Sequence, residues 1–302
     1  MKRIALIAAV LALNFFSFSY AFAEGTCGID QNQPCNQFMN RLEIFKKLRA
    51  EEGNNEDAQK NLILLEKFQK QYGLDLKYAA DNFLLLKETI GGTHWTKEAR
   101  ETFALIAYAT NHSYPFHVLR EHFAQILKAE KWDNMTDYHQ RIVHEQVVKN
   151  FSFIRRAVGR GLSWAEATNL FVAIRKLIGG YYNSPEAQAI FNSIVDGKSQ
   201  LTLNDHLEIY SRIFHSMEKD LKDSLLIYEL VLQAAKKCGD LHRATNDFLL
   251  LLESLGGARY SRTAQEIYKK FYGTISVPNP TVQPFIPVPQ KDESPEQNIR
   301  AE

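Results

Sequence analysis

The sequence predicts an all-α protein, with three related four-helix units stacked one on another as an α-solenoid-like array. Three observations support this prediction. Paired glycines occur at three places, an apolar stripe with helical spacing precedes each pair, and a hydroxyl residue follows each pair at a fixed distance. A compact bundle of three related helical subdomains is the alternative architecture.

The glycine pairs are Gly91-Gly92, Gly179-Gly180 and Gly256-Gly257. The four apolar residues before each pair, at steps of i, i+4, i+7 and i+11, are Ala79, Phe83, Leu86, Ile90; Ala167, Phe171, Ile174, Ile178; and Ala244, Phe248, Leu251, Leu255. These steps place each set on one face of a helix that ends at the pair, where glycine accepts a left-handed conformation. A phosphate-binding loop is the other interpretation of such pairs, but no strand and no G-x-G-x-x-G pattern accompanies them.

The next helix of each unit is expected to start just after the glycine pair. Thr96, Ser184 and Ser261 are suited to cap its first turn. The apolar positions Phe103, Phe191 and Tyr268 follow seven residues later and are expected to face the core.

The first half of each unit is found by comparing more distant segments. "RLEIFKKL" at 41–48 resembles "HLEIYSRI" at 206–213, and Leu42 and Leu207 each lie 49 residues before a glycine pair. The predicted units span 36–110, 114–197 and 202–273. Their first helices lie near 36–51, 114–130 and 202–218, and their second helices lie near 54–72, 136–160 and 220–238.

The two ends of the chain differ from the repeats. Residues 1–23 have the charged start, apolar run and Ala21-Phe22-Ala23 end of a signal peptide, so the protein is expected to be exported, to a periplasm or the cell exterior. Residues 24–35 form a loop in which Cys27 and Cys35 are expected to form a disulfide. Residues 275–302 are rich in proline and are expected to be a disordered tail.

Composition excludes several classes of function. Removal of the signal peptide takes away Lys2 and Arg3, which changes the net charge from +1 to −1. A net charge this close to zero provides no electrostatic attraction for nucleic acid. After the signal peptide, no apolar run has the length of a membrane span. We find no cofactor motif. Cys238 is expected to be buried near a helix end, and the adjacent acids Glu51 and Glu52 are expected to be solvated.

The middle unit breaks the pattern. Leu119 lies 60 residues before its glycine pair instead of 49, which indicates an insertion of 11 residues near 124–145 in a histidine-rich region. The candidate metal-binding or acid–base residues are His117, Glu121, His139 and His144. Their spacing matches no H-E-x-x-H pattern, so solvated or interface histidines are the other interpretation.

Two functions follow from this organisation. The first is a protein-binding or peptide-binding scaffold outside the cytoplasm, because stacked helices present a continuous surface. The alternative is an envelope or extracellular hydrolase with its site in the middle-unit insertion. The chain has no recognisable catalytic set, which favours binding over catalysis.

Overall fold

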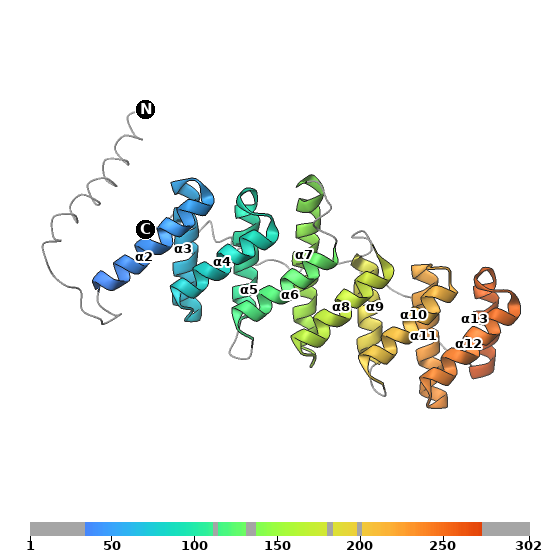
Figure 1. Cartoon of the computed structure of the whole chain (residues 1–302). Helices are drawn as coiled ribbons and strands as arrows, with labels where there is room; N and C mark the ends of the chain where they lie inside the picture. The colour runs from blue at the N-terminus through green and yellow to red at the C-terminus, as the bar shows by residue number, and fades with distance from the viewer. Residues whose placement is uncertain (1–33, 111–113, 131–136, 180–183, 198–200, 274–302) are drawn as a thin grey trace, which may run out of the picture. The chain divides into compact units, whose positions relative to one another are not determined.

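A computed structural model describes residues 34–110, 114–130, 137–179, 184–197 and 201–273 (Figure 1). Within these ranges the chain forms twelve α-helices, two short 3-10 helices and no β-strand, which confirms the all-α prediction. The predicted signal peptide, Cys27 and the tail at 275–302 lie outside the described residues, so the Cys27–Cys35 disulfide stays a prediction. The chain divides into two compact units at Tyr108 and Ala109.

The first compact unit contains four α-helices. They are α2 (Pro34–Glu52), α3 (Asn55–Tyr72), α4 (Leu76–Ile90) and α5 (Thr96–Ala109), with the 3-10 helix η1 (Thr93–Trp95) before α5. α2 contacts both α3 and α4, and α3 contacts α4. The ring of Phe103 lies 5.5 Å from that of Phe68 and 5.8 Å from that of Phe83, so the core joins α3, α4 and α5.

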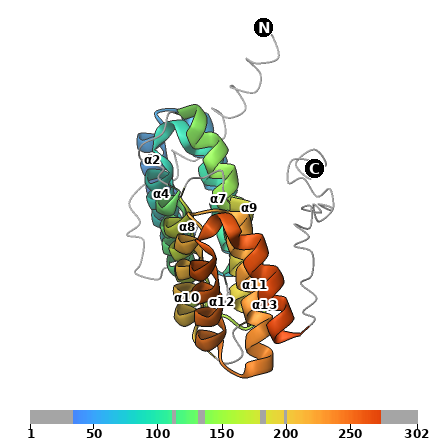
Figure 2. The ribbon, with the colours of Figure 1, turned by 90° about the vertical axis from the view of Figure 1, so that its right-hand side faces the viewer.

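The second compact unit contains eight α-helices in two series. They are α6 (Phe116–Ala129), α7 (Asp137–Val158), α8 (Trp164–Ile178), α9 (Ser184–Gly197), α10 (Leu203–Ser216), α11 (Leu221–Cys238), α12 (Leu241–Leu255) and α13 (Ser261–Tyr272). The helices α6, α8, α10 and α12 contact one another in that order, and α7, α9, α11 and α13 do the same. Figure 2 shows the layer of α10 and α12 beside the layer of α11 and α13.

The aligned phenylalanines lie in similar surroundings. Phe83, Phe171 and Phe248 are each 0% exposed. Each ring lies against the aromatic ring that the sequence pairs with it in the next helix, at 5.8 Å for Phe103, 6.4 Å for Phe191 and 5.3 Å for Tyr268. Each of the helix pairs α4/α5, α8/α9 and α12/α13 therefore contains one such buried aromatic contact.

The glycine pairs lie at the ends of α4, α8 and α12. The first glycines, Gly91, Gly179 and Gly256, have φ values of 130°, 69° and 105°. At Gly91 an added Cβ would lie 2.8 Å from the ring of Trp95, and at Gly256 it would lie 3.1 Å from the ring of Tyr260. At these two turns glycine therefore provides a positive φ and also room for an aromatic ring four residues later.

Thr96, Ser184 and Ser261 begin α5, α9 and α13, but their hydroxyls are bonded to other helices. Thr96 donates to Glu52 of α2 at 2.5 Å, and Ser261 donates to Asp223 of α11 at 2.8 Å. Ser184 accepts a 3.2 Å bond from Asn150 of α7. The sequence therefore locates these helix starts correctly, while the bonds made by the hydroxyls connect helices across the core.

The helix that follows α6 is longer than its predicted counterparts. α6 and α10 both have 14 residues, whereas α7 has 22 residues against 18 in α3 and α11. The burial pattern pairs Leu119 with His206, one residue away from the predicted pairing with Leu207. With this pairing, Glu130 corresponds to Glu52 in the first predicted unit and to Met217 in the third. The middle predicted unit then has ten more residues than the others between this position and its glycine pair, from Glu130 to Gly179.

Candidate functional site

The predicted histidine and glutamate set is divided between surface and core. His117 and Glu121 are exposed one turn apart on α6, and His139 is exposed on α7. His144 is only 3% exposed, and its ring lies 6.2 Å from that of Phe123. Within the described ranges no three His, Cys, Asp or Glu side chains are placed to hold a metal ion. The structure therefore does not gather these four residues into one metal-binding group.

His122, which was not among the candidates, is a core residue. It is 9% exposed, and its ring stacks 6.1 Å from that of Trp164. Burial lowers the pKa of this imidazole below its usual value, so the neutral form is favoured.

Two predictions about polar side chains are wrong. Cys238 is exposed at the end of α11, where its thiol lies 3.3 Å from the carbonyl oxygen of Asp240. Glu52 is buried instead of solvated, and its carboxylate pairs with Lys87 of α4 at 2.7 Å, each side chain being 2% exposed. A helix-end carboxylate is usually solvated, and only the tertiary structure reveals the lysine opposite it.

A second buried ion pair occupies the equivalent place between the C-cap of α6 and the side of α8. Arg175 donates two hydrogen bonds to Glu130, one of them from Nε at 2.9 Å, and the side chains are 1% and 0% exposed. Asn150 of α7 also donates to Glu130, at 3.2 Å. Burial raises the pKa of the Glu130 carboxyl, while the bonds from Arg175 and Asn150 oppose the rise. This pair fixes α8 against α6 and α7.

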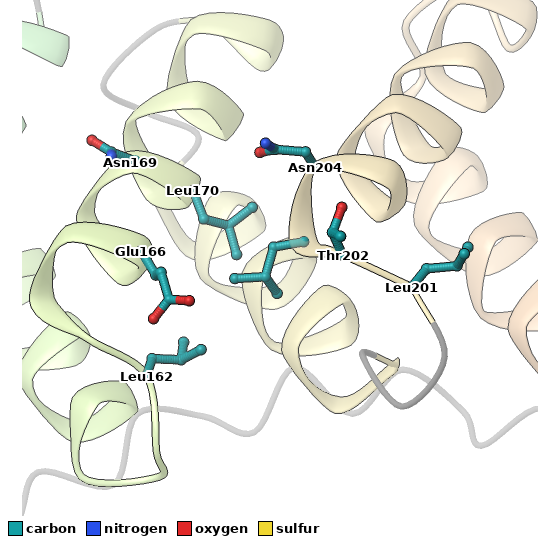
Figure 3. Close-up of a pocket in the computed structure, with 8 residues that line it drawn as sticks. Leu162, Glu166, Asn169, Leu170, Leu201, Thr202 and Asn204 are labelled. Atoms are coloured by element: carbon teal, nitrogen blue, oxygen red, sulfur yellow. The ribbon is translucent and has the colours of Figure 1, made fainter.

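A pocket of about 440 Å³ lies between the starts of α8 and α10 (Figure 3). Its lining consists of four leucines and four polar residues: Leu162, Leu170, Leu201, Leu203, Glu166, Asn169, Thr202 and Asn204. The volume is within the range of small-ligand sites, which are typically apolar with a few polar groups.

Two capping boxes fix the helix starts that line this pocket. Ser163 and Glu166 cap α8, and the Glu166 carboxylate accepts bonds from the Ser163 amide at 2.9 Å and hydroxyl at 2.7 Å. Thr202 and Asp205 cap α10 in the same way, and the bonds from Thr202 lower the pKa of the Asp205 carboxyl. Both acids are therefore engaged in structure, and each locks the first turn of its helix.

Amide side chains lie along the exposed face of α8, α10 and α12. Asn169 and Asn204 lie on opposite sides of the pocket, above Leu170, in Figure 3. Asn246 occupies the place on α12 that Asn169 has on α8, and it accepts a 2.7 Å bond from Arg212 of α10. Each amide carries donors and an acceptor, which match the carbonyl and N–H groups of a peptide backbone.

Comparison with protein-family models, curated proteins and solved structures finds no significant match. Within the described ranges, none of the helices is both long and apolar enough to cross a bilayer.

Sequence reasoning missed this pocket, although a signal for it exists. Ser163-x-x-Glu166 and Thr202-x-x-Asp205 are both capping-box patterns, and they mark two helix starts of the same kind. The contact between α8 and α10 brings those starts together, and a sequence pattern does not contain that contact.

Proposed function

We propose that this protein is an exported helical-repeat scaffold that binds an extended segment of a partner protein. The three predicted units are copies of one repeat stacked as an α-solenoid. The binding surface is the exposed face of α8, α10 and α12, centred on the pocket between α8 and α10.

The main support for this proposal is one pocket that combines leucine side chains at its base with asparagine side chains on two sides. Leu170 and Leu203 offer an apolar contact to one side chain of a bound segment. Asn169 and Asn204 on the two sides offer hydrogen bonds to its backbone. Recognition of an extended chain needs this division, with backbone bonds for affinity and a side-chain pocket for specificity.

The spacing of the helices suits an extended segment. Neighbouring packed helices lie about 8–10 Å apart, and an extended chain advances about 3.3 Å per residue. A segment of about six residues therefore crosses from Asn169 on α8 to Asn246 on α12. Arg212 on α10, already bonded to Asn246, lies along this path.

The solenoid part of the proposal is supported by the order of helix contacts in the second compact unit and by the shared burial of Phe83, Phe171 and Phe248. The export part rests on the sequence pattern of residues 1–23. The hydrolase alternative gains no support, because His144 packs in the core while His117, Glu121 and His139 lie on the surface.

A displayed library of random peptides provides the test. Peptides selected on the protein are measured against a variant with Asn169→Arg and Asn204→Arg, two exposed positions whose replacement leaves the core intact. Loss of two backbone bonds and the added bulk should weaken binding by about tenfold or more.

The matched control carries two arginines on the other layer, Thr263→Arg and Glu266→Arg on α13, where both side chains are exposed. This control should keep full affinity. Selection of no peptide, or equal weakening by both pairs of substitutions, would refute the proposed site.

A further inference from the structure

The last helix pair of the second compact unit has an apolar face that is covered in the pair before it. Phe271 of α13 is 80% exposed, whereas Ile194, its equivalent in α9, is 0% exposed. Leu251 and Ile267 are partly exposed, and their equivalents Ile174 and Ile190 are 0% exposed. The helices α10 and α11 pack against the pair α8/α9. Within the described part of the chain, no later helix packs against the pair α12/α13.

We call the surface formed by Leu251, Ile267 and Phe271 the end face. An inner repeat covers such a face with the next helix pair, and repeat arrays usually end in a unit with a polar outer side. The end face is apolar instead, which indicates that something other than water covers it.

The chain itself continues from this point. α13 ends at Tyr272, and the following Gly273 has a φ of 77°, which does not continue the helix. The carbonyl of the preceding Tyr272 accepts a 2.8 Å bond from Lys237 of α11, so the chain leaves α13 beside α11. Another 29 residues follow Gly273.

Those residues have an uneven composition. The apolar side chains lie almost entirely in the near half, interleaved with prolines: Ile275, Val277, Val282, Phe285, Ile286 and Val288. All charged side chains lie in the far half, from Lys291 to Glu302. A segment that only served as a solvated spacer would not need this division.

We infer that residues 274–289 lie along the end face and cover it in place of a further helix pair. The prolines exclude a helix, so the segment binds in an extended form of about 3.1 Å per residue. Its first fifteen residues reach about 45 Å, which is more than the width of two packed helices. Because the segment is tethered at Gly273, its effective concentration at the end face is in the millimolar range or above, well beyond that of a second copy.

Two truncations of the whole chain test this inference. Ending the chain after Pro289 removes the charged half, and ending it after Gly273 removes both halves. The first variant should match the full chain. The second should show amide exchange in α13 that is faster by about tenfold, and stronger binding of a hydrophobic dye.

A substitution completes the test. If the segment covers Phe271, then Phe271→Ser in the full chain should speed exchange in α13 as truncation after Gly273 does. The same substitution in the truncated chain should add almost nothing. An uncovered Phe271, by contrast, tolerates serine in both backgrounds.

Equal behaviour of the two truncations would overturn the inference, and so would equal effects of Phe271→Ser in both backgrounds. Protection of α13 that depends on protein concentration, with self-association in ultracentrifugation, would also overturn it and assign the end face to a second copy. The Asn169 and Asn204 variants should leave all these readouts unchanged, so this result is independent of the peptide-binding proposal.

Discussion

Replacing Arg175 by leucine should destabilise the second compact unit strongly, whereas a matched triple replacement should restore it. Within the described residues, Arg175 is the charged group that pairs with the Glu130 carboxylate, and both side chains are at most 1% exposed. Arg175→Leu leaves a buried, ionised carboxylate whose remaining bond comes from Asn150. Breaking a buried pair in this way costs about 3–5 kcal/mol.

The third predicted unit shows which residues make the replacement tolerable. At the places of Glu130, Asn150 and Arg175 it has Met217, Ile227 and Leu252, which are 3%, 0% and 2% exposed. The triple variant Glu130→Met, Asn150→Ile, Arg175→Leu therefore copies a set that already fills this place in the chain. Exchange of a buried ion pair for apolar residues of similar volume is often neutral or stabilising. We expect the triple variant to lie within about 1 kcal/mol of the wild type.

Urea unfolding followed by far-UV circular dichroism measures both variants. With a slope of about 1–3 kcal/mol per molar urea, Arg175→Leu should lower the midpoint by about 1 M or more. Lys176→Leu, an exposed neighbour on the same helix, is the control and should change stability by no more than about 0.5 kcal/mol. A loss below about 1 kcal/mol for Arg175→Leu, or a triple variant no more stable than the single one, would refute the reasoning.

The pH dependence of Arg175→Leu gives a second readout. Burial already raises the pKa of Glu130, and loss of the arginine removes the largest opposing influence. A carboxyl whose pKa is higher in the folded state than in the unfolded state binds its proton more tightly when folded. The stability deficit of Arg175→Leu should therefore be largest near neutral pH and should shrink as the pH falls toward the raised pKa.

Three further predictions concern single positions. Gly91→Ala should lower the free energy of unfolding by about 3 kcal/mol in the same urea assay, because the new Cβ clashes with Trp95 and the φ is unfavourable. Gly53→Ala is the control: its φ is 68° and nothing lies within 4 Å of the new Cβ, so it should cost about 1 kcal/mol. Burial lowers the pKa of His206, which is hydrogen-bonded to Tyr228 at 2.7 Å, so the stability of the protein should fall as the pH drops below the ordinary histidine value of 6.5. His206→Leu should flatten this pH dependence, and an unchanged slope would contradict the prediction. Thiol titration of the native protein should find one reactive cysteine, the exposed Cys238, and three after reduction in denaturant; three without reduction would exclude the Cys27–Cys35 disulfide.

The helices were predictable from the sequence because their signals are local. Each apolar stripe needs only one helix face, and each glycine turn needs only its own backbone, so the ends of α4, α8 and α12 fall at Ile90, Ile178 and Leu255 as predicted. The predicted alignment of α6 with α10 was wrong by one residue, because a short apolar match does not distinguish Leu207 from His206 as the counterpart of Leu119. Burial of both sides of the helix decides that register, and burial depends on neighbouring helices.

The candidate site was not predictable in the same way. Histidine and glutamate near an insertion indicate chemistry only if the fold brings them together, and His144 turns into the core while His117 does not. The pocket is formed by leucines and asparagines, which are common residue types without a motif. Its position depends on the contact between α8 and α10, which are separated by an entire helix in the chain.

Under the proposed repeat architecture, the buried pairs also bear on how the three predicted units would keep their order. Glu52 pairs with Lys87, Glu130 pairs with Arg175, and Met217 lies where the third pair would be. If the α12 segment packed in the place of α8, then Glu130 would face Leu252 and remain an unpaired buried charge, at a cost of about 3–5 kcal/mol. The correct and incorrect packings have nearly the same apolar stripes, so hydrophobic burial alone separates them poorly. The ion pairs therefore add discrimination at the positions where the repeated sequences are otherwise interchangeable.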